Sequence, residues 1–420
     1  MSADFLKNLT DAQDRDADLI LLQQAIGIDS ITGNETEFAL FLKRQMAELG
    51  LSCGEGGFLP GRLNVWGEEP ETAKEGPTLL FVGHTDTVHV RGWQEARKGT
   101  ALENPFSGAL VDGEVWGRGA CDLKGGICAA LSAYRLLQSA GIRLKGKMSF
   151  AFIGDEESGE PGTGVSAGAH DLVRRVTAGE ISRPDFAVYV EPTKLDVYTA
   201  QIGFFIADIT ITGKSAYFGT PELGIDALKA THAILSGIWA HEADLAAGPS
   251  HDLVGASSIL VTDINGGGFI AVPGECRLSL IRKLRPGEDL DDAVAAFEQA
   301  VCSVQLEDGI GLEIAYPAGR DHRFGGSPVE IPKNNEAANL LAECVRQTVP
   351  SAGAIGGAPY WSEMPFLVNA IGCPTVYCAP GDISVAHTFE ERINLESYLA
   401  AVRAFALFIA SYCGVENGPK

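Results

Sequence analysis

Histidine and acidic side chains follow short apolar segments at several points of the chain. The segments TLLFVG, MSFAFIG and FAVYV are continuously apolar, as strands buried on both faces are. A charged or polar side chain at the end of a buried strand is unfavourable unless it has a partner or a function. The residues that follow the three segments are His84 with Asp86, Glu156 with Glu157, and Glu191.

Two further segments add one carboxylate and one histidine. Asp122 lies in the glycine-rich segment GRGACDLKGG, directly before a predicted helix, and His387 lies in GDISVAHTFEE, after the last apolar segment. Sites in open α/β sheets form at the carboxyl ends of the strands, so we expect all these side chains to converge. Crowded carboxylates repel one another unless a cation neutralises them. Imidazole with carboxylate suits zinc, and also cobalt or manganese.

Each of these residues also has an ordinary structural interpretation. Asp122 has the position of a helix N-cap, His84 could cap a strand, and Glu156 with Glu157 could form a solvated turn. A single loop histidine such as His387 is more often hydrogen-bonded than a metal ligand. Because the structural interpretation requires several independent coincidences, all at strand ends, we favour a metal site.

The elements that would position these residues form an α/β domain. Helical apolar spacing over 37–49 and 125–141 alternates with buried strands over 78–83, 147–154 and 186–190. This alternation predicts a mostly parallel sheet.

From about Gly203 the pattern changes to a β-α-β-β-α-β order of the ferredoxin-like α+β type, before the α/β pattern returns. We therefore expect a catalytic domain in two parts, 1–202 and 317–420, with a smaller α+β domain inserted at 203–316.

Composition excludes several function classes. The chain has 420 residues, 32 Lys and Arg against 55 Asp and Glu, and a formal charge of −23. An acidic chain repels phosphate backbones, so we expect no nucleic-acid partner. The polar N-terminal segment lacks the apolar stretch of a signal peptide, and we expect no membrane span. Nine cysteines without a CxxC pair are typical of reduced thiols, which predicts a cytoplasmic protein.

Five short motifs, in order along the chain, resemble one metallohydrolase family. GHTDTV, GRGACDLKGG, GDEESG, VEPT and AHTFEE are similar to the motif series of the family of acetylornithine deacetylase, succinyl-diaminopimelate desuccinylase, aminoacylase and glutamate carboxypeptidase. The resemblance covers essentially the whole chain. It implies a two-metal hydrolase that acts on small molecules. It also implies that the inserted domain is a lid or dimerisation domain, and that the enzyme is a homodimer or a larger even-numbered homo-oligomer.

The resemblance also implies roles for single residues. The metal ligands would be His84, Asp122, Glu157, Glu191 and His387, with Asp122 bridging one or two ions of zinc, cobalt or manganese. Asp86 would orient His84, and Glu156 would be the general base. The metal would lower the pKa of a water, and Glu156 would pass its proton to the leaving nitrogen.

Substrate recognition departs from the family pattern. Tyr217 stands where relatives carry a histidine, Ile270 where they often carry an asparagine, and Lys283 where they carry a carboxylate-binding arginine. The segment GGAPYWSEMPF adds Tyr360 and Trp361. These changes indicate either neutral drift or an unusual substrate, and we expect Tyr217, Lys283 and Tyr360 to contact it.

Three functions are compatible with this pattern. The first is hydrolysis of N-acyl amino acids or small peptides. The second is removal of an aromatic amine by attack on the ring carbon, as in the 5-nitroanthranilate branch of the family, which the added aromatic residues favour. The third is a binding protein on an old enzyme fold, which the complete ligand set and Glu156 argue against.

Overall fold

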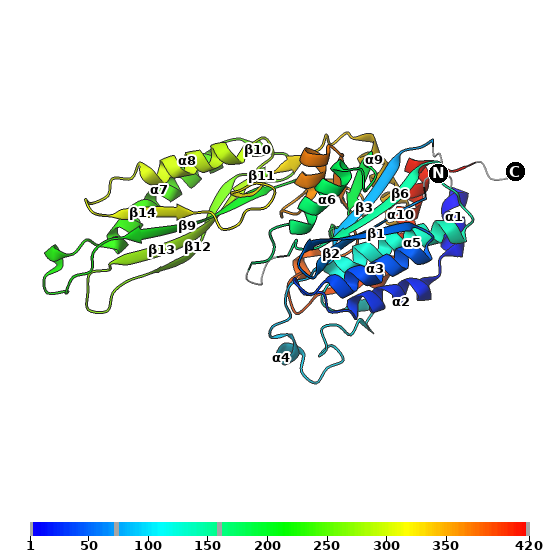
Figure 1. Ribbon diagram of the computed structural model, residues 1–420, viewed down its shortest axis with the longest axis horizontal. Coiled ribbons are helices and arrows are strands. Elements are labelled where there is room, and N and C mark those ends of the chain that lie inside the picture. Colours follow the sequence, from blue (N-terminus) through cyan, green and yellow to red (C-terminus); the bar gives the residue numbers. More distant parts are fainter. Residues whose placement is uncertain (1–2, 71–74, 158–161, 417–420) are drawn as a thin grey trace. The chain divides into compact units, whose positions relative to one another are not determined.

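The chain folds into two compact units. The structure, a computed structural model, describes residues 3–70, 75–157 and 162–416. The first unit comprises Met1–Thr199, Ile331–Gly356 and Phe366–Lys420, and the second comprises Ala200–Glu330 with Gly357–Pro365. Figure 1 shows both units, coloured along the sequence. The domain bounds expected from the sequence, 203 and 316, stay a prediction. The compact second unit runs further, because it also includes two short strands and loops after residue 316.

The first unit is built on a twisted sheet with the strand order β1-β2-β6-β3-β7-β18-β8. Strands β6, β3, β7 and β18 run parallel, whereas β1 and β2 are antiparallel to their neighbours at one edge. The bounds are β1 (Ser52–Leu59), β2 (Arg62–Glu68), β3 (Thr78–His84), β6 (Lys147–Ile153), β7 (Phe186–Tyr189), β8 (Val197–Gln201) and β18 (Thr375–Tyr377). The short strands β16 (Val329–Glu330) and β17 (Ile355–Ala358) pair with β8.

Helices cover both faces of this sheet, which explains why its strands are continuously apolar. On one face, Tyr134 and Phe405 pack against Phe150 and Phe81. On the other face, Arg175 lies over the Trp66 ring. The helices are α1 (Ala3–Ala12), α2 (Arg15–Ile26), α3 (Thr36–Glu48), α4 (Trp93–Arg97), α5 (Gly125–Ser139), α6 (Ala167–Thr177), α9 (Glu336–Thr348) and α10 (Leu395–Cys413). A small antiparallel sheet, in the order β19-β5-β4, consists of β4 (Ala109–Val111), β5 (Glu114–Trp116) and β19 (Arg392–Asn394).

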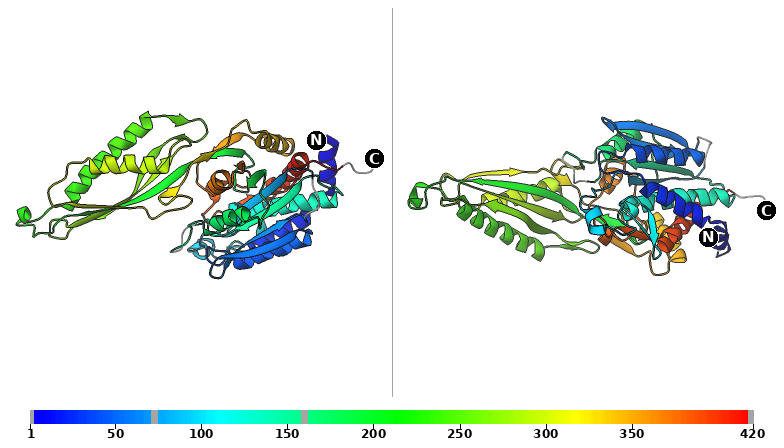
Figure 2. Two further views of the ribbon diagram at one scale, coloured as in Figure 1. Left: turned by 45° about the horizontal axis from the view of Figure 1, so that its top comes forward. Right: turned by 90° about the horizontal axis from the view of Figure 1, so that it is seen from below.

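The second unit is an antiparallel sheet in the order β12-β13-β9-β14, with two helices on one face (Figure 2). The elements are β9 (Gly203–Thr212), α7 (Ala227–Ala247), β10 (Ser250–His251), β11 (Gly255–Ala256), β12 (Ser258–Gly266), β13 (Glu275–Leu284), α8 (Leu290–Cys302), β14 (Gly311–Ala315) and β15 (Gly325–Gly326). Alternate residues of β9 and β13 are buried beneath α7 and α8, and Phe205, Ile234, Leu280 and Phe297 lie in this core. The expected fold class, a mostly parallel α/β domain with a separate ferredoxin-like α+β domain, is confirmed.

The expectation that no segment reaches the apolar length of a membrane span was wrong by length and composition. Helix α10 has 19 residues and is apolar enough to cross a membrane, but 67% of its apolar 18-residue stretch is buried inside the structure. It packs on α5 and α9 as a core helix does. The nine cysteines are free; seven are buried, Cys53 is half-buried and Cys302 is exposed.

Candidate metal centre

One carboxylate, that of Asp122, lies between two imidazole rings. Its Oδ1 is 3.2 Å from Nε2 of His84, and its Oδ2 is 3.1 Å from Nε2 of His387. His84 is the last residue of β3, and His387 follows the short 3-10 helix Ile383–Val385. Asp122 lies in the turn Ala120–Lys124 that leads into α5. A carboxylate whose two oxygens face two different imidazoles has the geometry needed to bridge two cations.

Glu157 and Glu191 complete one group on each side of Asp122. Oε1 of Glu157 is 2.9 Å from Nε2 of His387, and Oε1 of Glu191 is 3.7 Å from Nε2 of His84. Within each group the potential ligand atoms all lie within 4.8 Å of one another. Both glutamates follow parallel strands, β6 and β7, at the carboxyl edge of the sheet. The structure therefore brings together all five residues that the sequence nominates as ligands.

The electrostatics of these side chains fit a divalent cation. Burial would lower the pKa of His387, but hydrogen bonds to Asp122 and Glu157 raise it to about 11. Burial would raise the pKa of Asp122, but hydrogen bonds from His387 and His84 hold it well below its usual range. Burial and the nearby Asp122 charge raise the pKa of Glu157. The cluster thus favours positive charge, which bound metal ions would supply by displacing protons from imidazole.

The main-chain oxygen and the carboxylate of Asp86 contact different residues of the cluster. Nδ1 of His84 lies 2.9 Å from the main-chain oxygen of Asp86, whereas the nearest carboxylate oxygen is 3.9 Å away. The carboxylate instead accepts the main-chain N–H groups of Glu156 (3.2 Å) and Glu157 (2.9 Å) and the hydroxyl of Thr32 (3.0 Å). The main-chain oxygen of Asp86, and not its carboxylate, therefore hydrogen-bonds His84, and the expected role of the Asp86 side chain in orienting His84 stays a prediction. That bond leaves Nε2 of His84 as the ring atom that could bind a metal ion.

Glu156, the predicted base, is half-buried beside the ligands. It belongs to a group with His84 and Glu157 whose potential ligand atoms lie within 4.8 Å of one another. The preceding residue, Asp155, adopts a left-handed backbone (φ 75°). Its buried carboxylate accepts hydrogen bonds from the main-chain N–H groups of Gly164 and Val165 and forms an ion pair with Arg62 at 2.7 Å. This anchored turn redirects the chain after β6, so that Glu156 and Glu157 enter the cluster together.

Sequence analysis missed Glu391, which ties two ligand loops together. Its Oε1 accepts the main-chain N–H groups of Cys121 (3.2 Å) and Asp122 (3.1 Å), and its Oε2 pairs with Arg118. Glu391 and Arg118 are both buried. The signal was present, because Glu391 ends the motif AHTFEE that contains His387 and Arg118 lies in GRGACDLKGG. A buried carboxylate that accepts two peptide N–H groups holds the Asp122 turn in place.

The three residues expected to contact substrate lie in the second unit and outside the ligand cluster. Tyr217 is 61% exposed, and its ring contacts that of Phe218 at 4.6 Å. Nζ of Lys283 donates to the main-chain oxygen of Val254 at 2.6 Å. Tyr360 is half-buried. Their roles stay predictions.

Comparison with known proteins agrees with the fold and the site. Residues 80–411 match the peptidase family M20/M25/M40, so the chain belongs to this family. It is therefore a metal-dependent hydrolase that acts on C–N bonds, as the sequence predicts.

Individual relatives match the chain at low sequence identity, and a solved structure shares its fold. The chain is 31% identical to a succinyl-diaminopimelate desuccinylase of Gluconacetobacter diazotrophicus over 52% of this chain and 55% of the relative. It is 25% identical to the N-formyl-4-amino-5-aminomethyl-2-methylpyrimidine deformylase of Bacillus subtilis over 87% of each chain. An M20 family metallo-carboxypeptidase from Sulfolobus solfataricus has the same fold, with a TM-score of 0.74 at 18% identity over 94% of this chain and 99% of that one.

Proposed function

We propose that this enzyme holds two divalent metal ions and hydrolyses the amide bond of a small carboxylate-bearing substrate, an N-acyl amino acid or a small peptide. The observation that carries the proposal is the position of Asp122 between His84 and His387, with one glutamate beyond each histidine. A solved relative of the same fold is described as a dinuclear metal-binding peptidase of this family. Zinc, cobalt and manganese all suit this imidazole and carboxylate set.

We assign each side chain of the cluster a separate role. His84, Glu191 and Asp122 would hold one ion, and Asp122, Glu157 and His387 the other. When bound, such ions lower the pKa of water and polarise the scissile carbonyl. Glu156 then accepts the proton of the attacking water and returns it to the leaving nitrogen. Asp86 holds the Glu156 main chain in place through its N–H group.

The substrate class is tested with purified enzyme loaded in turn with zinc, cobalt or manganese. The panel contains N-acetyl amino acids, dipeptides, an N-formyl aminopyrimidine and carboxylated nitroanilines, with the Glu156→Ala variant as the matched inactive control. We expect metal-dependent release of a free amine from at least one amide. Release of ammonia from a nitroaniline, with every amide untouched, would favour the aromatic aminohydrolase instead. No turnover of any compound with any metal would contradict the proposal.

We also propose a cytoplasmic homodimer, or a larger even-numbered assembly, formed through the second unit. Strand β12 lies at the end of the strand order of its sheet and exposes Leu260 (64%) and Ile264 (50%). An exposed edge strand with apolar side chains favours pairing with another chain. Light scattering is expected to give at least twice the chain mass of 44.4 kDa. A monomer at assay concentration would refute the assembly.

A further inference from the structure

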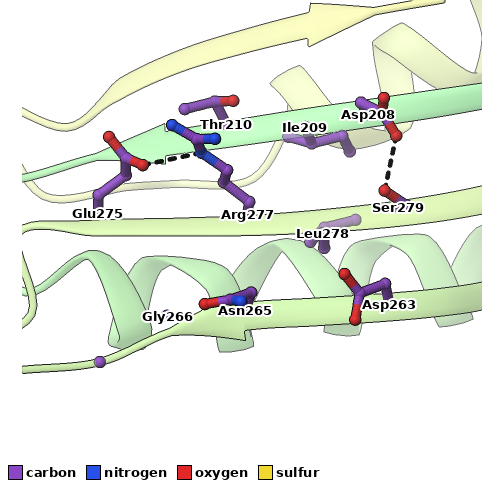
Figure 3. A pocket seen from close by; sticks show the side chains of 11 residues that line it. Asp208, Ile209, Thr210, Asp263, Asn265, Gly266, Glu275, Arg277, Leu278 and Ser279 are labelled. Carbon is purple, nitrogen blue, oxygen red and sulfur yellow. Dashed lines mark hydrogen bonds and ion pairs between the residues drawn. The ribbon is translucent and has the colours of Figure 1, made fainter. Parts of the chain in front are cut away.

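Charged side chains form ion pairs in both units, but the pairs differ in their exposure to solvent. On the uncovered face of the sheet of the second unit, Glu275 and Arg277 pair at 2.8 Å, with side chains that are 50% and 68% exposed (Figure 3). They line a pocket of about 810 Å³. An exposed pair of this kind contributes little to stability, and it costs little to form.

In the first unit, by contrast, Arg62 forms two ion pairs that are removed from solvent. Its guanidinium lies 2.6 Å from Oε1 of Glu35 and 2.7 Å from Oδ1 of Asp155, and it lies over the Phe58 ring at 5.1 Å. Both carboxylates are fully buried. Taking charges out of water is costly, and their attraction often does no more than offset that cost. The three charges are therefore weak evidence of stabilisation, and their place in the fold indicates another role.

One of the two carboxylates belongs to the turn that carries the predicted base. Asp155 directly precedes Glu156 and Glu157 and has a left-handed backbone (φ 75°). A residue other than glycine keeps such a conformation only when its surroundings hold it there. Besides Arg62, three main-chain N–H groups of residues 164–167 bond the Asp155 carboxylate.

Strand β2 holds this turn through two buried side chains. Because side chains alternate along a strand, Arg62 and Asn64 lie on the same face of β2. Oδ1 of Asn64 accepts the main-chain N–H of Gly154 at 3.1 Å, and Arg62 pairs with Asp155. Nδ2 of Asn64 donates to the main-chain oxygen of Gly168 at 2.8 Å, which fixes the orientation of the amide. Two successive residues of the turn are thus each held by a side chain of one strand.

Glu35 connects Arg62 to the loop that contacts Asp86. It lies in the same loop as Thr32, whose hydroxyl donates to the Asp86 carboxylate at 3.0 Å. A Cβ atom placed on Gly154 would lie 2.6 Å from Oε1 of Glu35, so this carboxylate packs directly on the turn. The turn is therefore held from two sides, since Asp86 accepts its N–H groups and Arg62 pairs with the residue before them.

We propose that Arg62 is a positioning residue for the reaction: its two buried ion pairs fix the turn at Asp155 and thereby the place of Glu156 beside the ligand cluster. The inference rests on the proposed function, in which Glu156 is the general base. A base must lie within hydrogen-bond reach of the proton that it accepts, so a small displacement of the turn lowers turnover. Arginine suits this role because its planar guanidinium can donate to two carboxylates at once, whereas lysine carries a compact ammonium.

The test measures kcat and KM at saturating metal, on the amide that the wild-type enzyme hydrolyses fastest. Losing a hydrogen bond to a charged group typically costs about tenfold or more, so Arg62→Met is expected to lower kcat by at least about tenfold. KM is expected to change little, because Arg62 does not touch substrate in this proposal. Arg62→Lys keeps the charge without the planar fork, and its kcat is expected to lie between those of Arg62→Met and wild type.

A double variant covers the case in which Arg62→Met does not fold. Glu35→Gln/Arg62→Met removes one negative charge together with the positive one, and Asp155 keeps its three N–H donors. We expect cooperative unfolding in urea and the same fall in kcat. The matched control is Arg135→Met, which removes an ion pair with the buried Asp18 at 2.7 Å, outside the network around the turn. Its kcat is expected to stay at the wild-type value.

Hydrogen exchange of the Glu156 and Glu157 main-chain N–H groups gives a readout that needs no substrate. It is followed by mass spectrometry on the full-length chain, with and without added metal. Exchange is expected to be about tenfold or more faster in the Arg62 variants, because the turn opens more often, and unchanged in Arg135→Met.

Three outcomes would overturn the proposal. They are a wild-type kcat in a folded Arg62→Met or double variant, an equal loss of kcat in Arg135→Met, and unchanged exchange of both N–H groups. If the wild-type enzyme turns over no amide, the proposed function fails, and the exchange rates still decide whether Arg62 holds the turn.

Discussion

The carboxylate of Asp86 offers the sharpest test of how the site is built. It accepts three hydrogen bonds, from the N–H groups of Glu156 and Glu157 and from the hydroxyl of Thr32. In Asp86→Asn the single side-chain oxygen can serve Glu157 and Thr32, but the amide nitrogen would face the Glu156 N–H, donor against donor. The base residue would then lose its main-chain anchor.

The size of the effect follows from this one lost bond. A hydrogen bond to a charged group contributes about 1.5–3 kcal/mol, which corresponds to about 10- to 150-fold in rate. We therefore expect kcat of Asp86→Asn to fall by that factor at saturating metal. The main-chain oxygen that holds His84 is unchanged, so metal affinity is expected to fall by less than about tenfold.

The assay combines kcat on an N-acetyl amino acid at saturating metal with a calorimetric metal titration. Thr32→Val is the matched control, because it removes one hydroxyl donor and leaves both N–H contacts of Asp86 intact. Its kcat is expected to stay within a few-fold of wild type. An Asp86→Asn variant with wild-type kcat and a 10- to 100-fold loss of metal affinity would show that the carboxylate orients His84 after all.

Three further predictions concern other residues. Glu156→Ala is expected to bind metal normally in the same titration but to lose about a hundred-fold or more in kcat, and a wild-type kcat would exclude it as the base. Glu391→Ala is expected to weaken metal binding by about tenfold or more, because two N–H groups of the Asp122 turn lose their shared acceptor, and unchanged affinity would contradict that role. The pKa of Glu288 lies below its usual value, since hydrogen bonds from Arg282 and Ser257 outweigh burial. A carboxylate whose pKa is lower in the folded than in the unfolded protein stabilises the fold at pH values above its unfolded pKa of about 4.3. This stabilisation is lost as the pH falls through the folded pKa. Glu288→Gln is therefore expected to lower the free energy of unfolding by about 1–3 kcal/mol at pH 7, with the difference shrinking below pH 4 in urea titrations. A difference independent of pH would refute this.

The sequence by itself determined the strands and what stands at their ends. Burial on both faces requires continuously apolar segments, so β3, β6 and β7 can be predicted from their own residues alone. Because parallel strands end at a common edge, the residues that follow them could be nominated as one site before their distances were known. The same reasoning separated the second unit, whose strands alternate because only one face is covered.

Only the tertiary structure decided which atom does what. The sequence cannot distinguish the main-chain oxygen of Asp86 from its carboxylate, and the two serve different partners. The motif AHTFEE contains Glu391, but its hydrogen-bond partners are set only when its loop meets the Asp122 turn, and the packing of Phe204 only when Trp361 contacts it. The burial of an apolar segment can be predicted from its own composition. A hydrogen bond or ring contact depends on angles and distances that are set by segments far apart in the chain.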